Sequence, residues 1–199
     1  MRIELESMAL ELPNVVGHPN RVPFRGVLTL VDVPSDKPPS GARGHRVMIT
    51  RAAVERALPS LLGMALDFAP SFDKHDARRK IGVITSAEMK PWRELFEAAG
   101  QNPSTLPSGT GPQQLEVTGF IYAKDFPEVV REMRSGGRQV HGMSYEIADA
   151  RVADMSAAVW TIEQFTFTGA ALLRRDKAAY RNTWIELVPA GASALRPSL

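Results

Sequence analysis

Short segments rich in β-branched and aromatic residues recur along the chain between stretches of proline and glycine, and this alternation constrains the fold most strongly. Helices are predicted over residues 51–62, 91–99 and 126–134, the last of them stopped by Gly136-Gly137. Strands outnumber helices, so the pattern favours a mainly β core, either a barrel or a sandwich, with a few helices around it. The predicted strands are residues 24–33, 46–49, 81–89, 115–122, 140–150 and 159–167.

Length and composition predict a single domain. The chain has 199 residues, 44% of them hydrophobic, which is enough for one core and too few for two large domains. We therefore expect one domain over residues 1–188, followed by a flexible tail over residues 189–199. Proline and glycine predict exposed loops over residues 34–44 and 100–112, while residues 170–188 are of mixed character and fit no single element.

The charge balance and the absence of cysteine exclude several classes of function. There are 24 Lys and Arg against 22 Asp and Glu, a net charge of +2, so we expect no nucleic-acid partner. The lack of cysteine excludes a disulfide framework, a thiolate zinc site and a cysteine nucleophile. No segment approaches the roughly 18 apolar residues of a membrane span, and acids occupy the N-terminus, so we expect a soluble intracellular protein without membrane contact.

Two residues are candidates for acyl-transfer chemistry. Ser144 follows Gly142-Met143 at the start of an extended apolar segment, and His75 lies in a polar stretch before Ile81. A serine hydroxyl attacks a carbonyl only when a neighbouring base accepts its proton, so serine and histidine are the minimum pair. Taken alone, a strand serine that bonds a carbonyl and a surface histidine are the commoner interpretations.

Metal and nucleotide sites find little support in the motifs. His75-Asp76 is a dipeptide also used by metal phosphohydrolases, but the other histidines, His18, His45 and His141, are not at metal-ligand spacing. The glycine-rich stretches lack the Gly-Lys-Ser/Thr ending of a phosphate-binding loop. We therefore predict neither a metal nor another cofactor.

The order of several motifs resembles the prohead (capsid maturation) proteases of tailed bacteriophages, which are similar to the herpesvirus assemblin fold. The resemblance covers residues 24–185, and it depends on order and spacing because each motif is short. The motifs are Gly-His-Arg-Val before the first helix, a histidine before Ile-Gly-Val, Leu-Glu-Val-Thr-Gly, Gly-Met-Ser-Tyr-Glu and Phe-Thr-Phe-Thr-Gly-Ala-Ala-Leu-Leu. The resemblance implies an α+β fold with a mainly antiparallel β-barrel core and a few surrounding helices.

The same resemblance implies that Ser144 and His75 are the catalytic pair of a serine endopeptidase. The family commonly places an acid or a second histidine in the strand after the serine, but residues 165–169 contain no titratable group. Glu163 is our first choice for the third member. Glu146 is the alternative, since it shares a strand face with Ser144, whereas the odd offset of His141 places it on the opposite face.

The oxyanion site is also assigned only by resemblance. Arg174 and Arg175 fall where the herpesvirus branch has arginines that stabilise the oxyanion, and Gly142 is assigned to the same oxyanion or substrate region. A solvated arginine pair is the alternative.

The implied function is processing of scaffold and capsid precursors inside an immature phage shell in the host cytoplasm. The phage scaffold protein and major capsid protein would then be substrates that enter as extended strands beside the Ser144 strand, and a homodimer is possible. A catalytically inactive capsid-assembly or scaffold-like protein of the same fold is the main alternative, because the third member is missing. A host-type domain that matches the motifs by chance is a weaker one.

Overall fold

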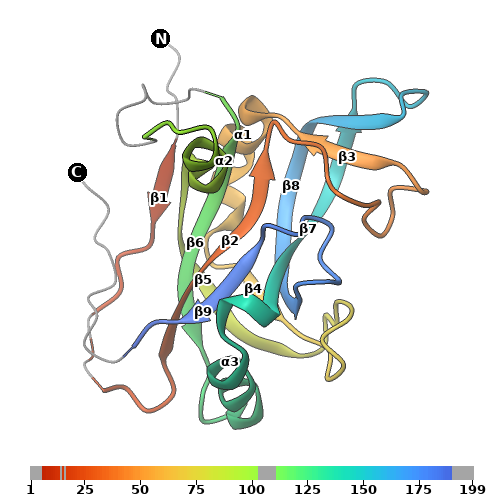
Figure 1. The fold of residues 1–199 in the computed structure, drawn as a ribbon. Coiled ribbons are helices and arrows are strands. Elements are labelled where there is room, and N and C mark those ends of the chain that lie inside the picture. The colour runs from red at the N-terminus through yellow and green to blue at the C-terminus, as the bar shows by residue number, and fades with distance from the viewer. Residues whose placement is uncertain (1–5, 14, 16, 103–110, 190–199) are drawn as a thin grey trace.

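A curled sheet of nine strands makes up most of the part of the protein that the structure describes (Figure 1). The computed structural model describes residues 6–13, 15, 17–102 and 111–189. The strands run in the order β3-β8-β4-β5-β6-β2-β9, with β1 added beside β5 and β7 beside β8. Their bounds are β1 Ser7–Ala9, β2 Val22–Val31, β3 Arg46–Ile49, β4 Ala65–Asp67, β5 Lys80–Pro91, β6 Gln113–Ile121, β7 His141–Val152, β8 Val159–Arg174 and β9 Trp184–Leu187.

The sheet is a half-barrel and does not close, which corrects the predicted barrel. Most neighbouring strands are antiparallel as expected, but β3 and β4 run parallel to β8. The two ends of the curl are β7 and β9, and they form no ladder with each other. The side chain of Thr183, the residue before β9, connects them instead. Its hydroxyl accepts a hydrogen bond from the Met143 N–H of β7 at 3.2 Å. The seam of the half-barrel therefore runs beside the strand that carries Ser144.

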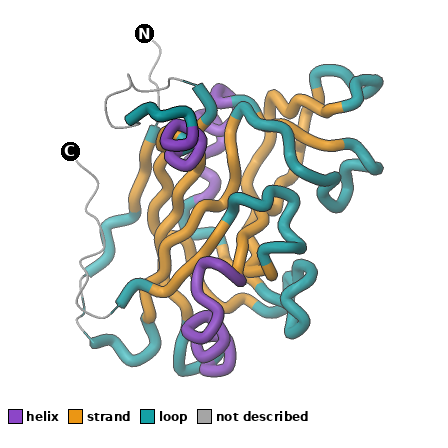
Figure 2. The backbone as a smooth tube through the Cα atoms, in the orientation of Figure 1, coloured by secondary structure: helices purple, strands orange, loops and turns teal. Residues whose placement is uncertain are grey.

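Three helices lie around the sheet in the described ranges, and α2 (Arg93–Ala98) and α3 (Pro127–Val140) lie at its opposite ends (Figure 2). Helix α1 (Arg51–Leu61) begins at Thr50, whose hydroxyl accepts the Ala53 N–H at 3.2 Å as an N-cap. It buries Val54, Leu58 and Leu61, and Ser60 Oγ accepts the N–H of Phe167 at 2.9 Å, which ties the helix to β8. None of the helices described is long and apolar enough to cross a membrane.

The main hydrophobic core consists of buried side chains from most of the strands and from α1 and α3. Burial of this apolar surface supplies the main stabilising term in a chain without cysteine. Among its largest members are Phe24, Leu28, Leu58, Ile84, Leu115 and Phe167.

The structure corrects several predicted element boundaries. Gly137 has a non-helical backbone (φ 55°, ψ −165°), so the first helical stretch of α3 stops at the glycine pair as predicted, and a second short stretch continues from there to Val140. Strand β8 continues seven residues past the predicted end at Phe167, and β1 and β4 were not predicted. Residues 103–110 of the predicted loop and 190–199 of the predicted tail lie outside the described residues.

Candidate active site

Three adjacent strands bring Asp67 and Ser144 onto one face of the sheet. Asp67 on β4 pairs with Ala171 on β8, and Ala171 pairs on its other side with Ser144 on β7. Paired residues of neighbouring strands project to the same face, and each strand spacing is about 4.8 Å. The Cα atoms of Asp67 and Ser144 are therefore about 10 Å apart, with the small side chain of Ala171 between them.

Glu146 lies on the same face, two residues after Ser144 along β7. Its partner on β8 is Gly169, and a Cβ atom built on this glycine would lie 2.6 Å from Oε2 of Glu146. Any side chain at position 169 would therefore displace the carboxylate. Gly169 and Ala171 together form a low floor on which the carboxylate lies directly against the backbone of β8.

The loop between β4 and β5 carries His75 over this floor. The N–H of Asp76 donates to Oδ1 of Asp67 at 3.2 Å, which fastens the loop next to the histidine. At its other side, the carbonyl of Phe72 accepts the N–H of Arg174 at 2.7 Å, with Phe72 in a left-handed backbone conformation (φ 51°). The loop is thus held on both sides of the histidine, by one hydrogen bond to the Asp67 carboxylate and by one between main-chain groups.

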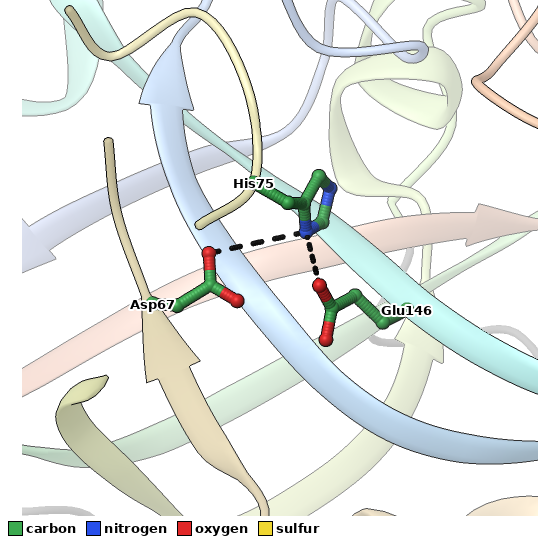
Figure 3. A group of neighbouring side chains, drawn as sticks. All are labelled: Asp67, His75 and Glu146. Carbon is green, nitrogen blue, oxygen red and sulfur yellow. Dashed lines mark ion pairs between the residues drawn. The ribbon is translucent and has the colours of Figure 1, made fainter. Parts of the chain in front are cut away.

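His75 faces two carboxylates through one ring nitrogen (Figure 3). Its Nδ1 lies 3.0 Å from Oε1 of Glu146 and 4.0 Å from Oδ1 of Asp67, while Nε2 points away from both (Figure 3). Nδ1 is buried, and the Glu146 oxygen lies off the direction of a hydrogen bond, so the contact is an ion pair when the ring is protonated. Asp67 is fully buried, and Nζ of Lys80 at 3.3 Å from its Oδ2 compensates its charge.

Ser144, His75 and Glu146 therefore share one neighbourhood. Alternate residues of a strand are about 7 Å apart, so Ser144 and the glutamate that contacts His75 are neighbours on one face of β7. Among the residues described, no hydrogen bond joins the Ser144 hydroxyl to the imidazole. The arrangement is a histidine held by a carboxylate, with a half-buried serine beside the pair.

Glu163, the first choice for the third member, is not brought to His75. It is exposed on β8, and its carbonyl accepts a hydrogen bond from the guanidinium of Arg56. It lies six positions before Gly169, which corresponds to about 20 Å along a strand. The antiparallel register places Glu146 opposite Gly169, and so Glu146, the second choice, is the glutamate next to His75.

Arg174 and Arg175 are likewise not brought to Ser144. Arg174 pairs with His141, three positions along β8 from Ala171, or about 10 Å from the serine. Its guanidinium bonds the Asp176 carboxylate at 2.8 and 3.0 Å. The Arg175 guanidinium donates to the carbonyl of Arg181 at 2.7 Å and to Gln139 at 3.4 Å.

Gly142 and His141 have packing roles at the start of β7. A Cβ on Gly142 would lie 3.0 Å from Oγ1 of Thr183, so this glycine allows the close approach of the chain at the seam. His141 is 1% exposed, its ring centroid lies 5.6 Å from that of Phe72, and its Nδ1 has no hydrogen-bond partner among the described residues. Burial lowers the pKa of His141.

Asp67 is the site residue that the sequence did not indicate. It ends a strand of only three residues, too short for any periodic pattern to reveal. With His75 and Glu146 it forms a group whose possible ligand atoms all lie within 4.8 Å of one another. No local sequence motif marks this group, because its members come from β4, from the loop that follows β4 and from β7.

The comparisons with known proteins add no relatives. No protein-family model, no curated protein and no solved structure matches this chain. The function is therefore argued from the site.

Proposed function

We propose that the protein is a serine endopeptidase in which Ser144 is the nucleophile, His75 the general base and Glu146 the carboxylate that holds the base. The observation that carries the proposal is the 3.0 Å approach of His75 Nδ1 to Glu146, on the sheet face that Ser144 shares. A carboxylate at Nδ1 orients the imidazole and stabilises the imidazolium that forms when the ring accepts the serine proton. Glu146 thus supplies the group that residues 165–169 lack.

In the proposed reaction, His75 Nε2 accepts the proton of the Ser144 hydroxyl as its oxygen attacks the substrate carbonyl. The same nitrogen then delivers that proton to the leaving amine. Nε2 is the nitrogen that points away from the carboxylates, so we assign this role to it (Figure 3). Because no hydrogen bond joins Ser144 to His75 in the free protein, we expect a small movement of the imidazole when substrate binds, as catalytic contacts often tighten only in the complex.

The open edge of β7 supports a peptide substrate. The Met143 N–H points to the seam, away from β8, and in a regular antiparallel strand the main-chain groups of Tyr145 point to the same side. In the described chain no strand pairs with β7 on that side. We propose that the substrate adds there as an extended strand, held by main-chain hydrogen bonds beside Ser144.

From the motif resemblance we further propose that the substrates are phage scaffold and capsid precursors, cut inside the prohead. Co-expression with such a precursor tests this part. Processing by the wild-type chain and none by Ser144→Ala is the expected result.

Labelling with a fluorophosphonate tests the chemistry without knowledge of the substrate. We expect the probe on Ser144 by peptide mapping, no label on Ser144→Ala, and labelling slowed by orders of magnitude in His75→Gln and Glu146→Gln. Glu163→Gln and Ser156→Ala, which alter an exposed glutamate and an exposed serine, serve as matched controls and should label like the wild type. Undiminished labelling of a folded Ser144→Ala variant would exclude the proposal.

The missing Ser144 to His75 hydrogen bond favours one second candidate, a non-catalytic assembly protein of the same fold. Folded wild-type protein that stays unlabelled between about pH 6 and 9, where a serine and histidine pair is active, would support this candidate over the enzyme.

A further inference from the structure

We propose that Asp67, His75 and Glu146 form a binding site for a divalent transition-metal cation of the Zn²⁺ class. The inference goes beyond the proposed function, because the cation would bind whether or not Ser144 is a nucleophile. One imidazole and two carboxylates are a donor set that Zn²⁺ accepts, and three protein ligands leave a coordination position for water.

The spacing of the donor atoms is close to that of a metal site. Ligand atoms in a tetrahedral zinc site are about 3.3 Å apart, since each lies about 2.0 Å from the metal. Nδ1 of His75 and Oε1 of Glu146 are 3.0 Å apart, and Oδ1 of Asp67 lies 4.0 Å from the same nitrogen. The possible ligand atoms of Asp67 and Glu146 lie within 4.8 Å of each other, so binding requires them to approach by up to about 1.5 Å, within the reach of a glutamate side chain.

The state of His75 Nδ1 is a second and independent observation. The atom is buried, faces both carboxylates and has no hydrogen-bond partner among the described residues (Figure 3). A nitrogen in this position costs free energy in the free protein unless something binds it, and a metal ion would accept its lone pair. The side chains of His75 and Glu146 are 28% and 25% exposed, so the group lies close to the protein surface.

The local charge also favours a cation. Within the described part of the chain, Lys80 is the one lysine or arginine that forms an ion pair with either of the two carboxylates; it contacts Oδ2 of Asp67 and leaves Oδ1 directed at the histidine. The Asp76 N–H that also reaches Oδ1 leaves it a second lone pair. Gly169 keeps the space in which the Glu146 carboxylate lies, so both acids are already in position.

The test is a Zn²⁺ titration of the full chain after chelator treatment, read by competition with a chromophoric chelator. We expect one ion per chain in the wild type, and affinity at least about tenfold lower in Glu146→Gln and His75→Gln. His45→Gln and Glu163→Gln are matched controls that should bind normally, because neither residue belongs to the group. Equal affinity in wild type and Glu146→Gln, or no binding by folded wild-type protein, would overturn the inference.

A second readout separates this inference from the proposed function. Bound Zn²⁺ should protect His75 from carbethoxylation, mapped by mass spectrometry, and should slow fluorophosphonate labelling wherever labelling occurs. Zinc binding with no labelling at all would support the metal site and contradict the proposed protease function. If, at saturating Zn²⁺, Ser144 were labelled at the full rate and His75 still reacted, the protease function would be supported and the metal site would be overturned.

Discussion

Replacing Gly169 with alanine should impair the proposed active site without removing any functional group. The new Cβ would lie 2.6 Å from Oε2 of Glu146, and ordinary contact begins near 3.4 Å, so the carboxylate has to move by about 0.8 Å. A movement of this size directed away from His75 would lengthen the 3.0 Å approach of the carboxylate to the imidazole to about 3.8 Å. At an effective dielectric constant of about 20, the attraction between carboxylate and imidazolium weakens by about 1.2 kcal/mol, or roughly sevenfold in rate.

Misorientation of the imidazole adds to this loss, since a displacement near 1 Å can cost up to about 10²-fold. We therefore expect labelling of Ser144 to slow between about sevenfold and a hundredfold in Gly169→Ala. The fold should tolerate the change, because Gly169 is not among the residues with positive φ and the next neighbour of the new atom, the Ala65 carbonyl, lies at 3.5 Å. The free energy of unfolding should change by no more than about 1 kcal/mol.

The assay is a double-mutant cycle on the second-order rate constant of fluorophosphonate labelling. The cycle compares the wild type with Gly169→Ala, Glu146→Ala and the double variant. If the alanine acts by displacing the carboxylate, it should have no further effect once Glu146 has been truncated. An equal loss in both backgrounds, or a wild-type rate in the folded single variant, would refute the chain of contacts from Gly169 through Glu146 to His75.

Three further predictions concern stability. Burial lowers the pKa of His141, so the neutral imidazole is favoured in the folded state. The free energy of unfolding should therefore be highest above the unfolded pKa of about 6.5 and should decrease as pH falls below it, by at most about 1.4 kcal/mol per pH unit. His141→Gln should flatten this slope in denaturant unfolding measured across pH. Thr183→Val leaves the Met143 N–H unpaired at the seam and should cost about 1–3 kcal/mol in the same assay, and a wild-type midpoint would show that this hydrogen bond does not stabilise the seam. Thr50→Ala removes the N-cap of α1 and should lower the melting temperature through a loss of about 1 kcal/mol, whereas an unchanged melting temperature would contradict the capping role.

The elements with strong local patterns could be predicted from the sequence. β2, β5, β6 and α1 lie within a few residues of their predicted bounds, because apolar periodicity and capping residues specify them locally. β4 could not be predicted, since three residues show no period and the strand exists only through its pairing with β5 and β8. It nevertheless carries Asp67.

The predicted end of β8 was wrong, and the residues by which the strand is longer belong to the candidate site. Gly169, Ala170 and Ala171 are small residues with low strand propensity, so the strand was expected to stop at Phe167. In the structure they continue the ladder between β4 and β7, and two of them form the floor beneath His75. Local propensity was overridden where room was needed for a carboxylate and an imidazole, and such departures are expected at functional sites.

The choice between Glu146 and Glu163 shows what kind of information was missing. Period-2 alternation already placed Glu146 on the face of Ser144, but it could not say which glutamate meets His75. That depends on the register of β8 against β7, which includes a shift directly after Glu146, and on the loop that carries the histidine. Register is set by long-range pairing, and neither glutamate carries a local sign of it.

The open seam links the corrected fold to the proposed chemistry. A closed barrel would have paired both edges of β7 and left no free main-chain groups beside Ser144. In the half-barrel, one hydroxyl, from Thr183, takes the place of a ladder at the start of β7, and a peptide strand can pair with the residues that follow. The feature of the fold that the sequence did not predict is therefore the one that would let an extended chain pair with β7 beside Ser144.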